Sequence, residues 1–153
     1  MKIVVGEGSC GIAAGAAKVY SAIGKLIGST ASTLTVTGCI GMCFLEPIVD
    51  IYDGGELKKR LVKVQPEDAE KIIAYVNGDE NAVNDIEISD DDKLFLEKQT
   101  RIALRHCGII NPEVIDEYTA EDGYKALEKV LKTMTPEEVI EEIKVSGLAG
   151  RGG

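Results

Sequence analysis

The chain has 153 residues, of which 44% are hydrophobic and only 5% aromatic, and its 26 acidic and 17 basic residues give a formal net charge of −9. A chain of this length can bury one ordinary core, or two small cores joined by a linker, without disulfide staples. The acidic balance, with no basic stripe, argues against nucleic acid or an anionic membrane as a partner, so the expected partners are other proteins.

The beginning of the chain and its cysteines bear on the compartment. A strand-like run follows Met1 directly, and no apolar stretch approaches the roughly 18 residues of a membrane span, so we expect neither a signal peptide nor direct membrane insertion. We therefore expect a cytoplasmic protein. Four cysteines in a reducing compartment are more often metal ligands or redox thiols than structural disulfides.

The first elements alternate between strand and helix. The apolar, β-branched run Ile3–Val5 predicts a buried strand over residues 2–5, which is followed by a glycine-bearing loop that holds Cys10. Residues 13–27 are rich in alanine, with apolar residues at three-to-four spacing, and predict a helix that packs on a sheet. A second strand is expected at residues 34–37.

A short loop after residues 34–37 holds Cys39 and Cys43, and this loop is the feature around which we expect the chain to be organised. Gly38 and Gly41 allow the loop to turn tightly, so that both thiolates can reach one metal ion or cluster. Backbone N–H groups that turn inward in such a loop bond to cluster sulfur and tune its reduction potential.

The two cysteine loops are expected to meet in space. If the strands at residues 2–5 and 34–37 are neighbours in one sheet, both loops leave the sheet at the same end, and Cys10 approaches Cys39 and Cys43. Three thiols would then converge on one site.

Other interpretations of Cys39 and Cys43 remain open. Cysteine is often buried, so the pair could be two small residues packed in a turn. Zinc is a further alternative, although Cys-x3-Cys matches the usual Cys-x2-Cys pairs poorly. A redox dithiol of the thioredoxin type would require Cys-x-x-Cys beside the start of a helix, and the sequence lacks that motif.

The remaining elements of the first half complete an α/β fold. Pro47 precedes a third strand at residues 48–52, and Asp53–Gly55 predicts a hairpin turn before a fourth strand at residues 57–64. A helix with proline in its first turn follows at residues 66–76. The order β-α-β-β-β-α is that of a small thioredoxin-like sandwich, which we expect to span residues 1–77.

The second half is expected to be mainly helical. Residues 78–93 are strongly acidic and predict a linker, so that the second part spans residues 94–153. Within it, Thr135–Glu138 has the pattern of a capping box with proline in the first turn, and Gly147 ends the helix that follows.

These motifs together resemble a known family. Residues 8–16 and 37–43, with Glu46–Pro47, resemble the thioredoxin-like [2Fe-2S] ferredoxin domain. That domain occurs at the N-terminus of the NADH-binding flavoprotein subunit of electron-bifurcating and NAD(P)-dependent hydrogenases and related formate dehydrogenases. Segments of the second half are similar to the start of the flavoprotein core of the same subunit: residues 99–108, 111–113, 123–124, 134–138 and 147–153.

The resemblance implies a [2Fe-2S] cluster held by Cys10, Cys39 and Cys43, with one departure from the family pattern. Members with four cysteines have a further cysteine at the place that Val5 occupies here. A [2Fe-2S] cluster prefers four thiolates, so Ser9, Glu7 or an outside group would complete the ligand set, or the cluster would not form.

For the second half, the resemblance implies that Gly150, Arg151, Gly152 and Gly153 begin the loop that holds FMN and NADH. Ala149 stands where the family pattern has arginine. The body of the flavin and nucleotide site is absent from this sequence. FMN and NAD(P)H would therefore bind only in a complete flavoprotein subunit, and we do not expect this chain to be catalytic alone.

Two functions follow from these expectations. The first is an electron-transfer module of a multi-subunit NAD(P)-linked oxidoreductase, hydrogenase or NADH dehydrogenase in type. The second is a docking module of such a complex that has lost its cluster, which Val5 favours. His106 and Cys107 could form a base and nucleophile pair, but a packed or partner-facing thiol is the preferred interpretation. Exposed apolar residues in the helical part suggest a homo-oligomer.

Overall fold

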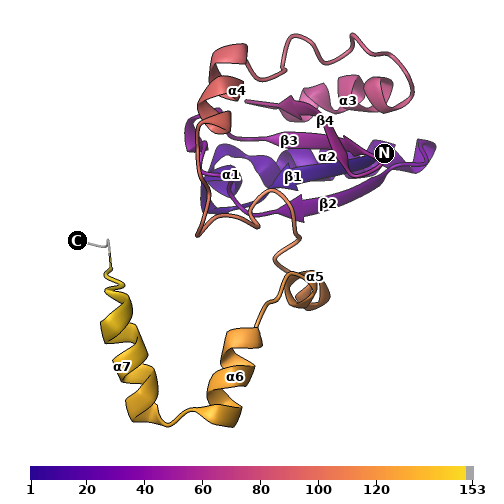
Figure 1. Cartoon of the computed structure of the whole chain (residues 1–153). Coiled ribbons are helices and arrows are strands. Elements are labelled where there is room, and N and C mark those ends of the chain that lie inside the picture. Colours follow the sequence, from indigo (N-terminus) through magenta and orange to yellow (C-terminus); the bar gives the residue numbers. More distant parts are fainter. Residues whose placement is uncertain (151–153) are drawn as a thin grey trace. The chain divides into compact units, whose positions relative to one another are not determined.

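The computed structural model describes residues 1–150, which form two compact units divided between Glu113 and Val114. The first unit contains a four-stranded sheet in the order β2-β1-β3-β4 (Figure 1). Strand β1 pairs with β2 in parallel and with β3 in antiparallel, and β3 and β4 form a hairpin. The strands are β1 (Lys2–Gly6), β2 (Thr33–Thr37), β3 (Val49–Asp53) and β4 (Glu56–Leu61).

The helices of this unit complete the predicted order β-α-β-β-β-α, which is confirmed. The helix predicted between the first two strands consists of two pieces, because Gly15 has a φ of 106° that other residues rarely adopt. A short 3-10 turn, Pro66–Asp68, precedes the helix that follows the fourth strand. These helices are α1 (Ser9–Ala14), α2 (Ala16–Leu26), α3 (Ala69–Val76) and, after the sheet is complete, α4 (Asp90–Glu97).

One face of the sheet carries the apolar core. Ile3 of β1 and Ile51 of β3 are partners in the sheet, and both are fully buried against Val19 and Ile23 of α2 and Ile72 of α3. Because side chains alternate along a strand, the residues between them point to the other face. Helices α2 and α3 thus cover this face of the sheet, whereas Leu96 of α4 packs in a second cluster with Ile48 and Ile88.

The other face has polar residues beside the buried apolar side chains of Val4 and Ile48, and these polar residues meet residues 101–111. Thr37 donates to the carbonyl of Ile110 and accepts from the N–H of Gly108, at 2.8 and 2.9 Å. The hydroxyl of Tyr52 also donates to the carbonyl of Gly108, at 3.0 Å, and Asn111 donates to Thr35 at 3.1 Å. This stretch, which the sequence analysis places in the mainly helical second part, covers the second face without regular secondary structure.

A buried ion pair lies on the same polar face. Asp50 of β3 is 2% exposed and accepts two hydrogen bonds from the guanidinium of Arg60 of β4, at 2.8 and 2.7 Å. Burial raises the pKa of the Asp50 carboxyl, and the charge of Arg60 opposes that effect. The pair joins the two strands of the hairpin across the polar face.

Residues 78–89 continue along the edge of the sheet. Glu87 forms an isolated bridge with Leu61, and Ile88 donates its N–H to the carbonyl of Arg60 at 2.9 Å. The side chains of Val83 and Ile88 are buried. By its contacts this stretch belongs to the first unit, which ends at Glu113; the functional division at residues 77 and 93 stays a prediction.

The second unit is helical, as predicted. The helix α7 begins with the predicted capping box, in which Thr135 and Glu138 bond to each other's backbone N–H, and it ends at Gly147 in the left-handed conformation. No residue of these helices is buried. They are α5 (Ile115–Ala120), α6 (Lys125–Thr133) and α7 (Pro136–Ser146). Among residues 1–150, no helix has the length and apolar character needed to cross a membrane.

Candidate metal centre

The parallel pairing of β1 and β2 brings the two cysteine segments to the same end of the sheet. The last residues of these strands, Gly6 and Thr37, are partners in the sheet. Cys39 lies on the loop after β2, as predicted. Cys10 differs from the prediction, because it lies in the first turn of α1 rather than in a loop.

Glycines allow α1 to approach this loop so closely. A Cβ on Gly8 would lie 2.7 Å from the Cβ of Cys39, and one on Gly11 would lie 2.2 Å from the carbonyl oxygen of Gly6. No side chain fits at either position without a shift of backbone. The helical start of α1 therefore depends on these two glycines, and the loop prediction was wrong because glycine also ends helices and marks loops.

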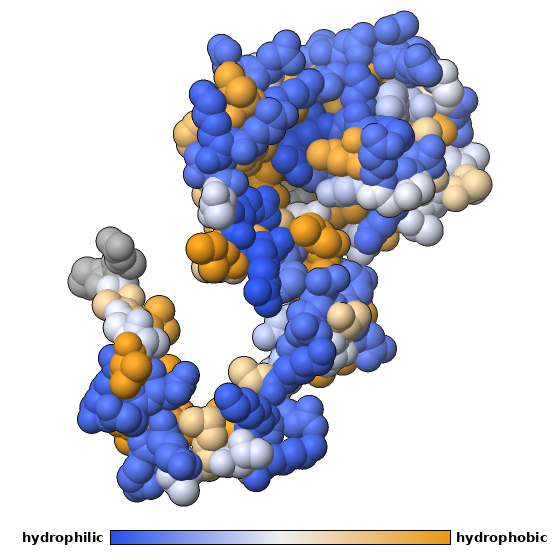
Figure 2. All heavy atoms as spheres, viewed as in Figure 1, coloured by the Kyte–Doolittle hydropathy of each residue, from blue (hydrophilic) through white to orange (hydrophobic). Residues whose placement is uncertain are grey.

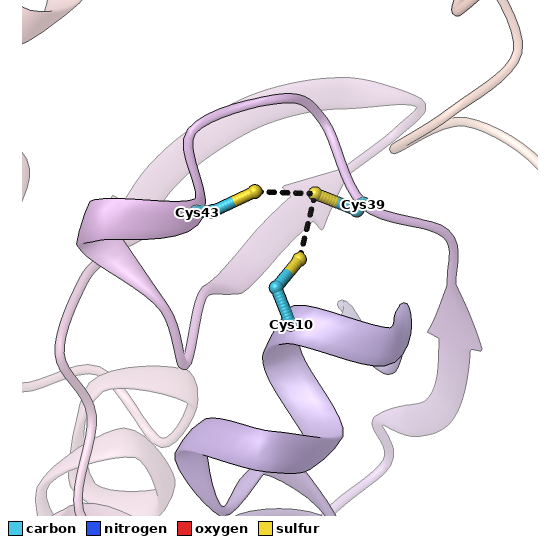
Figure 3. Close-up of side chains that lie close together, drawn as sticks. All are labelled: Cys10, Cys39 and Cys43. Atoms are coloured by element: carbon cyan, nitrogen blue, oxygen red, sulfur yellow. Dashed lines mark hydrogen bonds between the residues drawn. The ribbon is translucent and has the colours of Figure 1, made fainter. Parts of the chain in front are cut away.

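The three thiols converge, as the sequence analysis predicts. Figure 3 shows the side chains of Cys10, Cys39 and Cys43 pointing toward one another from α1, the loop after β2 and the turn at Cys43–Leu45. The sulfur of Cys39 is 3.0 Å from that of Cys10 and 3.6 Å from that of Cys43. All three sulfurs lie within 4.8 Å of one another.

The pKa values of Cys10 and Cys39 are shifted in opposite directions. A hydrogen bond with Cys39 lowers the pKa of Cys10, whereas burial raises the pKa of Cys39 to about 12. The N–H of Gly41 donates to the sulfur of Cys39 at 3.3 Å, which favours the thiolate at that position.

The donor set fits a thiophilic metal or an iron–sulfur cluster. With metal–sulfur bonds of about 2.3 Å, two sulfur ligands of one tetrahedral ion lie about 3.8 Å apart, close to the 3.6 Å between Cys39 and Cys43. Thiolates select zinc, copper(I) and iron–sulfur clusters over magnesium or calcium. Three thiolates leave one ligand of a four-coordinate set to another group.

The two residues that the sequence analysis offers as the fourth ligand are Glu7, between β1 and α1, and Ser9, the first residue of α1. Ser9 is exposed, and Glu7 is only partly buried. Burial and the nearby charge of Glu113 raise the pKa of Glu7. Neither side chain has a hydrogen bond to a cysteine sulfur in the described part of the chain.

A third acid, to which the sequence analysis gave no role, lies closer to the sulfurs. Glu46 is 7% exposed, and its Oε1 is 4.0 Å from the sulfur of Cys10. Its Oε2 accepts from the N–H of Ile48 at 2.9 Å. Burial raises the pKa of Glu46. Its position directly before Pro47, three residues after Cys43, is the only sequence signal that could have indicated it.

The fourth cysteine lies outside the group of three. A Cβ on Gly38 would lie 3.6 Å from the sulfur of Cys107, so this thiol packs against the backbone of the cysteine loop. Its sulfur is not among those within 4.8 Å of one another. The neighbouring His106 accepts a hydrogen bond from Arg105 at 2.7 Å. A packed thiol, as preferred above, agrees with this position.

The predicted FMN and NADH residues are mostly beyond the described part of the chain. Gly150 is exposed at the end of it, and Arg151, Gly152 and Gly153 lie outside the described residues. Their assignment to a nucleotide loop stays a prediction.

Known proteins share parts of this sequence, although no protein-family model matches it. The chain is 62% identical over 56 residues, 37% of its length and 11% of the relative, to the NADP-reducing hydrogenase subunit HndC of Solidesulfovibrio fructosivorans. It is 39% identical over 61 residues, 40% of its length and 14% of the relative, to a subunit of the NADH-quinone oxidoreductase of Aquifex aeolicus. The predicted family resemblance is confirmed.

The fold of the first unit has a counterpart among solved structures. A cysteine-to-serine variant of the thioredoxin-like [2Fe-2S] ferredoxin from Aquifex aeolicus matches with a TM-score of 0.50 and 20% sequence identity, over 58% of this chain and 98% of the ferredoxin. The predicted fold class, a thioredoxin-like α/β domain followed by a mainly helical segment, is confirmed. The chain spans only 11% and 14% of the hydrogenase and oxidoreductase subunits above, so the likeness does not establish their activities for it.

Proposed function

We propose that this chain is an electron-transfer module of a multi-subunit NAD(P)-linked oxidoreductase, of the hydrogenase or NADH dehydrogenase type. The observation that carries the proposal is the convergence of the sulfurs of Cys10, Cys39 and Cys43 within 4.8 Å at one end of a thioredoxin-like sheet. A [2Fe-2S] cluster bound there would supply single-electron transfer. The protein would hold the cluster rigidly and set its potential through groups such as the Gly41 N–H.

The helical part extends this proposal to the rest of the chain. We infer that residues 94–153 are the beginning of a flavoprotein core, in which Gly150, Arg151, Gly152 and Gly153 start the loop for FMN and NAD(P)H. Residues 1–77 would be the ferredoxin domain, and residues 78–93 would join the two. FMN and NAD(P)H would bind in a complete flavoprotein subunit of this kind.

The expected partners are the other subunits of such a complex. In support, α6 and α7 leave apolar side chains in solvent, among them Leu131 and Ile143, at 77% and 51% exposure (Figure 2). A second copy of the chain could cover the same side chains, and a monomeric mass at micromolar concentration would contradict that homo-oligomer. The free thiols fit a reducing compartment, which supports a cytoplasmic location.

A second candidate function has one observation in its favour. Val5, at the place of the absent cysteine, is a fully buried residue of β1 and packs in the apolar core. The domain could then be a docking module of the same complex that binds no cluster. The retention of three converging thiols and of the glycines around them favours the electron carrier, because serine or alanine would suffice for packing alone.

The two functions are separated by the iron and acid-labile sulfide content of protein purified without oxygen, together with the EPR spectrum of the reduced protein. We expect near two irons and two sulfides per chain, and their loss in Cys39→Ser. Cys107→Ser is the matched control, since its sulfur is outside the group, and it should retain the iron. A folded wild-type protein that binds no iron and cannot be reconstituted would leave the docking module as the better account.

A further inference from the structure

The buried carboxylate of Glu46 lies beside the thiol of Cys10, and packing with charged neighbours does not explain its place. Within residues 1–150, no lysine or arginine forms an ion pair with it. An uncompensated buried carboxylate costs several kcal/mol by desolvation alone. A glutamate kept at 7% exposure without a basic partner therefore requires another source of stabilisation.

The surroundings of Glu46 direct its two oxygens to different partners. The Oε2 atom accepts from the N–H of Ile48 at 2.9 Å, which fixes the orientation of the carboxylate. The Oε1 atom is turned toward the thiols, 4.0 Å from the sulfur of Cys10. The backbones of Gly6 and Gly11 leave room for it, since a Cβ on either would lie 3.3 or 3.1 Å from Oε2.

These distances suit a shared metal site. With bonds of about 2.3 Å to sulfur and 2.0 Å to a carboxylate oxygen, the two ligands of one tetrahedral ion lie about 3.5 Å apart. The 4.0 Å between Oε1 and the sulfur of Cys10 is within a small side-chain rotation of that value. Cys39 and Cys43 are 4 residues apart in one segment. Cys10 lies in a separate segment, α1, and Glu46 is the acid beside it.

We propose that Glu46 is the fourth ligand of the metal centre, through Oε1, beside the thiolates of Cys10, Cys39 and Cys43. The inference rests on the proposed function and names the residue that completes its site. On loading, one iron–oxygen bond and three iron–sulfur bonds to the protein form. The protons of the three thiols, and of Glu46 where it is protonated, go to solvent, and no oxidation or reduction of the protein is involved.

A carboxylate ligand supplies the fourth anionic donor that the family pattern provides from residue 5, where Val5 is instead buried in the core on the helix-covered face of β1. Three thiolates and one carboxylate carry the same total charge as four thiolates, and the harder oxygen donor favours the oxidised iron.

The test compares the wild type with Glu46→Gln, Glu46→Cys and Glu7→Gln, all as the full chain prepared without oxygen. Glutamine keeps the volume of Glu46 and an acceptor for the Ile48 N–H, but removes the anionic donor. Glu7→Gln tests the competing ligand that the sequence analysis offers, an acid at the same end of the sheet that forms no hydrogen bond to the sulfurs within residues 1–150. Circular dichroism of each apo-protein establishes that it is folded.

For the iron–sulfur form, we expect Glu46→Gln to lose iron to a chelator at least about tenfold faster than the wild type, and Glu7→Gln to match the wild type. Glu46→Cys is expected to retain iron with altered EPR g values and a shifted reduction potential. Equal retention and identical EPR spectra in the wild type and Glu46→Gln would overturn the proposal.

A titration of each apo-protein with Co²⁺, followed by its visible absorption, makes failure of this proposal distinguishable from failure of the electron-transfer function. Tighter Co²⁺ binding by the wild type than by Glu46→Gln supports the ligand set even if no iron–sulfur cluster can be assembled, an outcome that would overturn only the electron carrier. Equal Co²⁺ affinity and equal spectra would overturn Glu46 as a ligand while leaving a cluster on three thiols intact.

Discussion

The two faces of the sheet are covered in opposite ways. On one face, Ile3 and Ile51 pack against the apolar sides of α2 and α3. On the other, Thr37, Asp50 and Tyr52 bond to charged or backbone partners, and an irregular stretch, residues 101–111, takes the place of a helix. Apolar packing tolerates many partners of suitable shape, whereas each buried hydrogen bond requires one partner in one place. The polar face therefore fixes the position of the stretch beside the cysteine loop, and the apolar face supplies most of the stability.

The largest expected effect is on the apolar face. Ile51→Ala removes a fully buried side chain from the centre of β3, and the cavity should lower the free energy of unfolding by about 4 kcal/mol. The measurement is urea unfolding of the full chain followed by circular dichroism. Ile51→Val is the matched control, with a loss of about 1 kcal/mol. Equal, small losses in both variants would contradict a close-packed apolar face.

On the polar face, Asp50→Ala should lower the free energy of unfolding by roughly 3 kcal/mol, because Arg60 would keep a buried charge without its partner. Removing both charges in Asp50→Leu with Arg60→Met should recover most of that loss. The same urea titration measures both proteins. A double variant as unstable as Asp50→Ala would indicate that the ion pair itself, rather than the orphaned charge, stabilises this face.

Thr37→Val tests the hydrogen bonds that hold residues 101–111. Valine has the shape of threonine but leaves the buried N–H of Gly108 without its acceptor, at a cost of about 2 kcal/mol. Amide hydrogen exchange at Gly108 should become faster, whereas Thr37→Ser, which keeps the hydroxyl, should leave it nearly unchanged. Equal protection in both variants would mean that the stretch is held by packing alone.

The smallest effect is expected at the edge of β4, which belongs to neither face. Glu87 bonds to Lys59 and Lys93; desolvation raises its pKa, but these two partners outweigh desolvation and lower it. A lowered folded pKa means that stability from Glu87 is present above its unfolded pKa of about 4.3 and is lost as the pH falls below it.

Glu87→Gln should therefore cost about 0.5 kcal/mol at pH 7 and almost nothing at pH 3. The measurement is the urea midpoint at both pH values, with Glu56→Gln, an acid in an exposed pair with Lys58, as the control. A loss that is as large at pH 3 as at pH 7 would exclude the charge of Glu87 as its cause.

The apolar face was predictable from the sequence because its residues repeat at the period of each element. The uninterrupted apolar run Ile3–Val5 and the three-to-four spacing in residues 13–27 indicate which side chains are buried. The convergence of Cys10 with Cys39 also followed, because parallel neighbouring strands place the loops after them at the same end.

The polar face and Glu46 were not predictable in this way. The partners of Thr37 are backbone groups of Gly108 and Ile110, more than 70 residues away, and a backbone partner leaves no trace in composition or periodicity. Glu46 is charged yet buried, so its sequence signal points to the surface. In both cases the deciding contact joins distant segments, and local patterns carry no information about it.

The closeness of Cys10 and Cys39 links metal loading to the conformational entropy of the chain. Their sulfurs are 3.0 Å apart although 29 residues separate them in sequence. Any group bonded to both would close a loop that contains α1, α2 and β2, and a covalent cross-link of that size removes about 3.6 kcal/mol of disorder from the unfolded chain. The centre would then act as a clasp on the first half of the sheet, so that its loss would loosen β2 from β1 as well as abolish its chemistry.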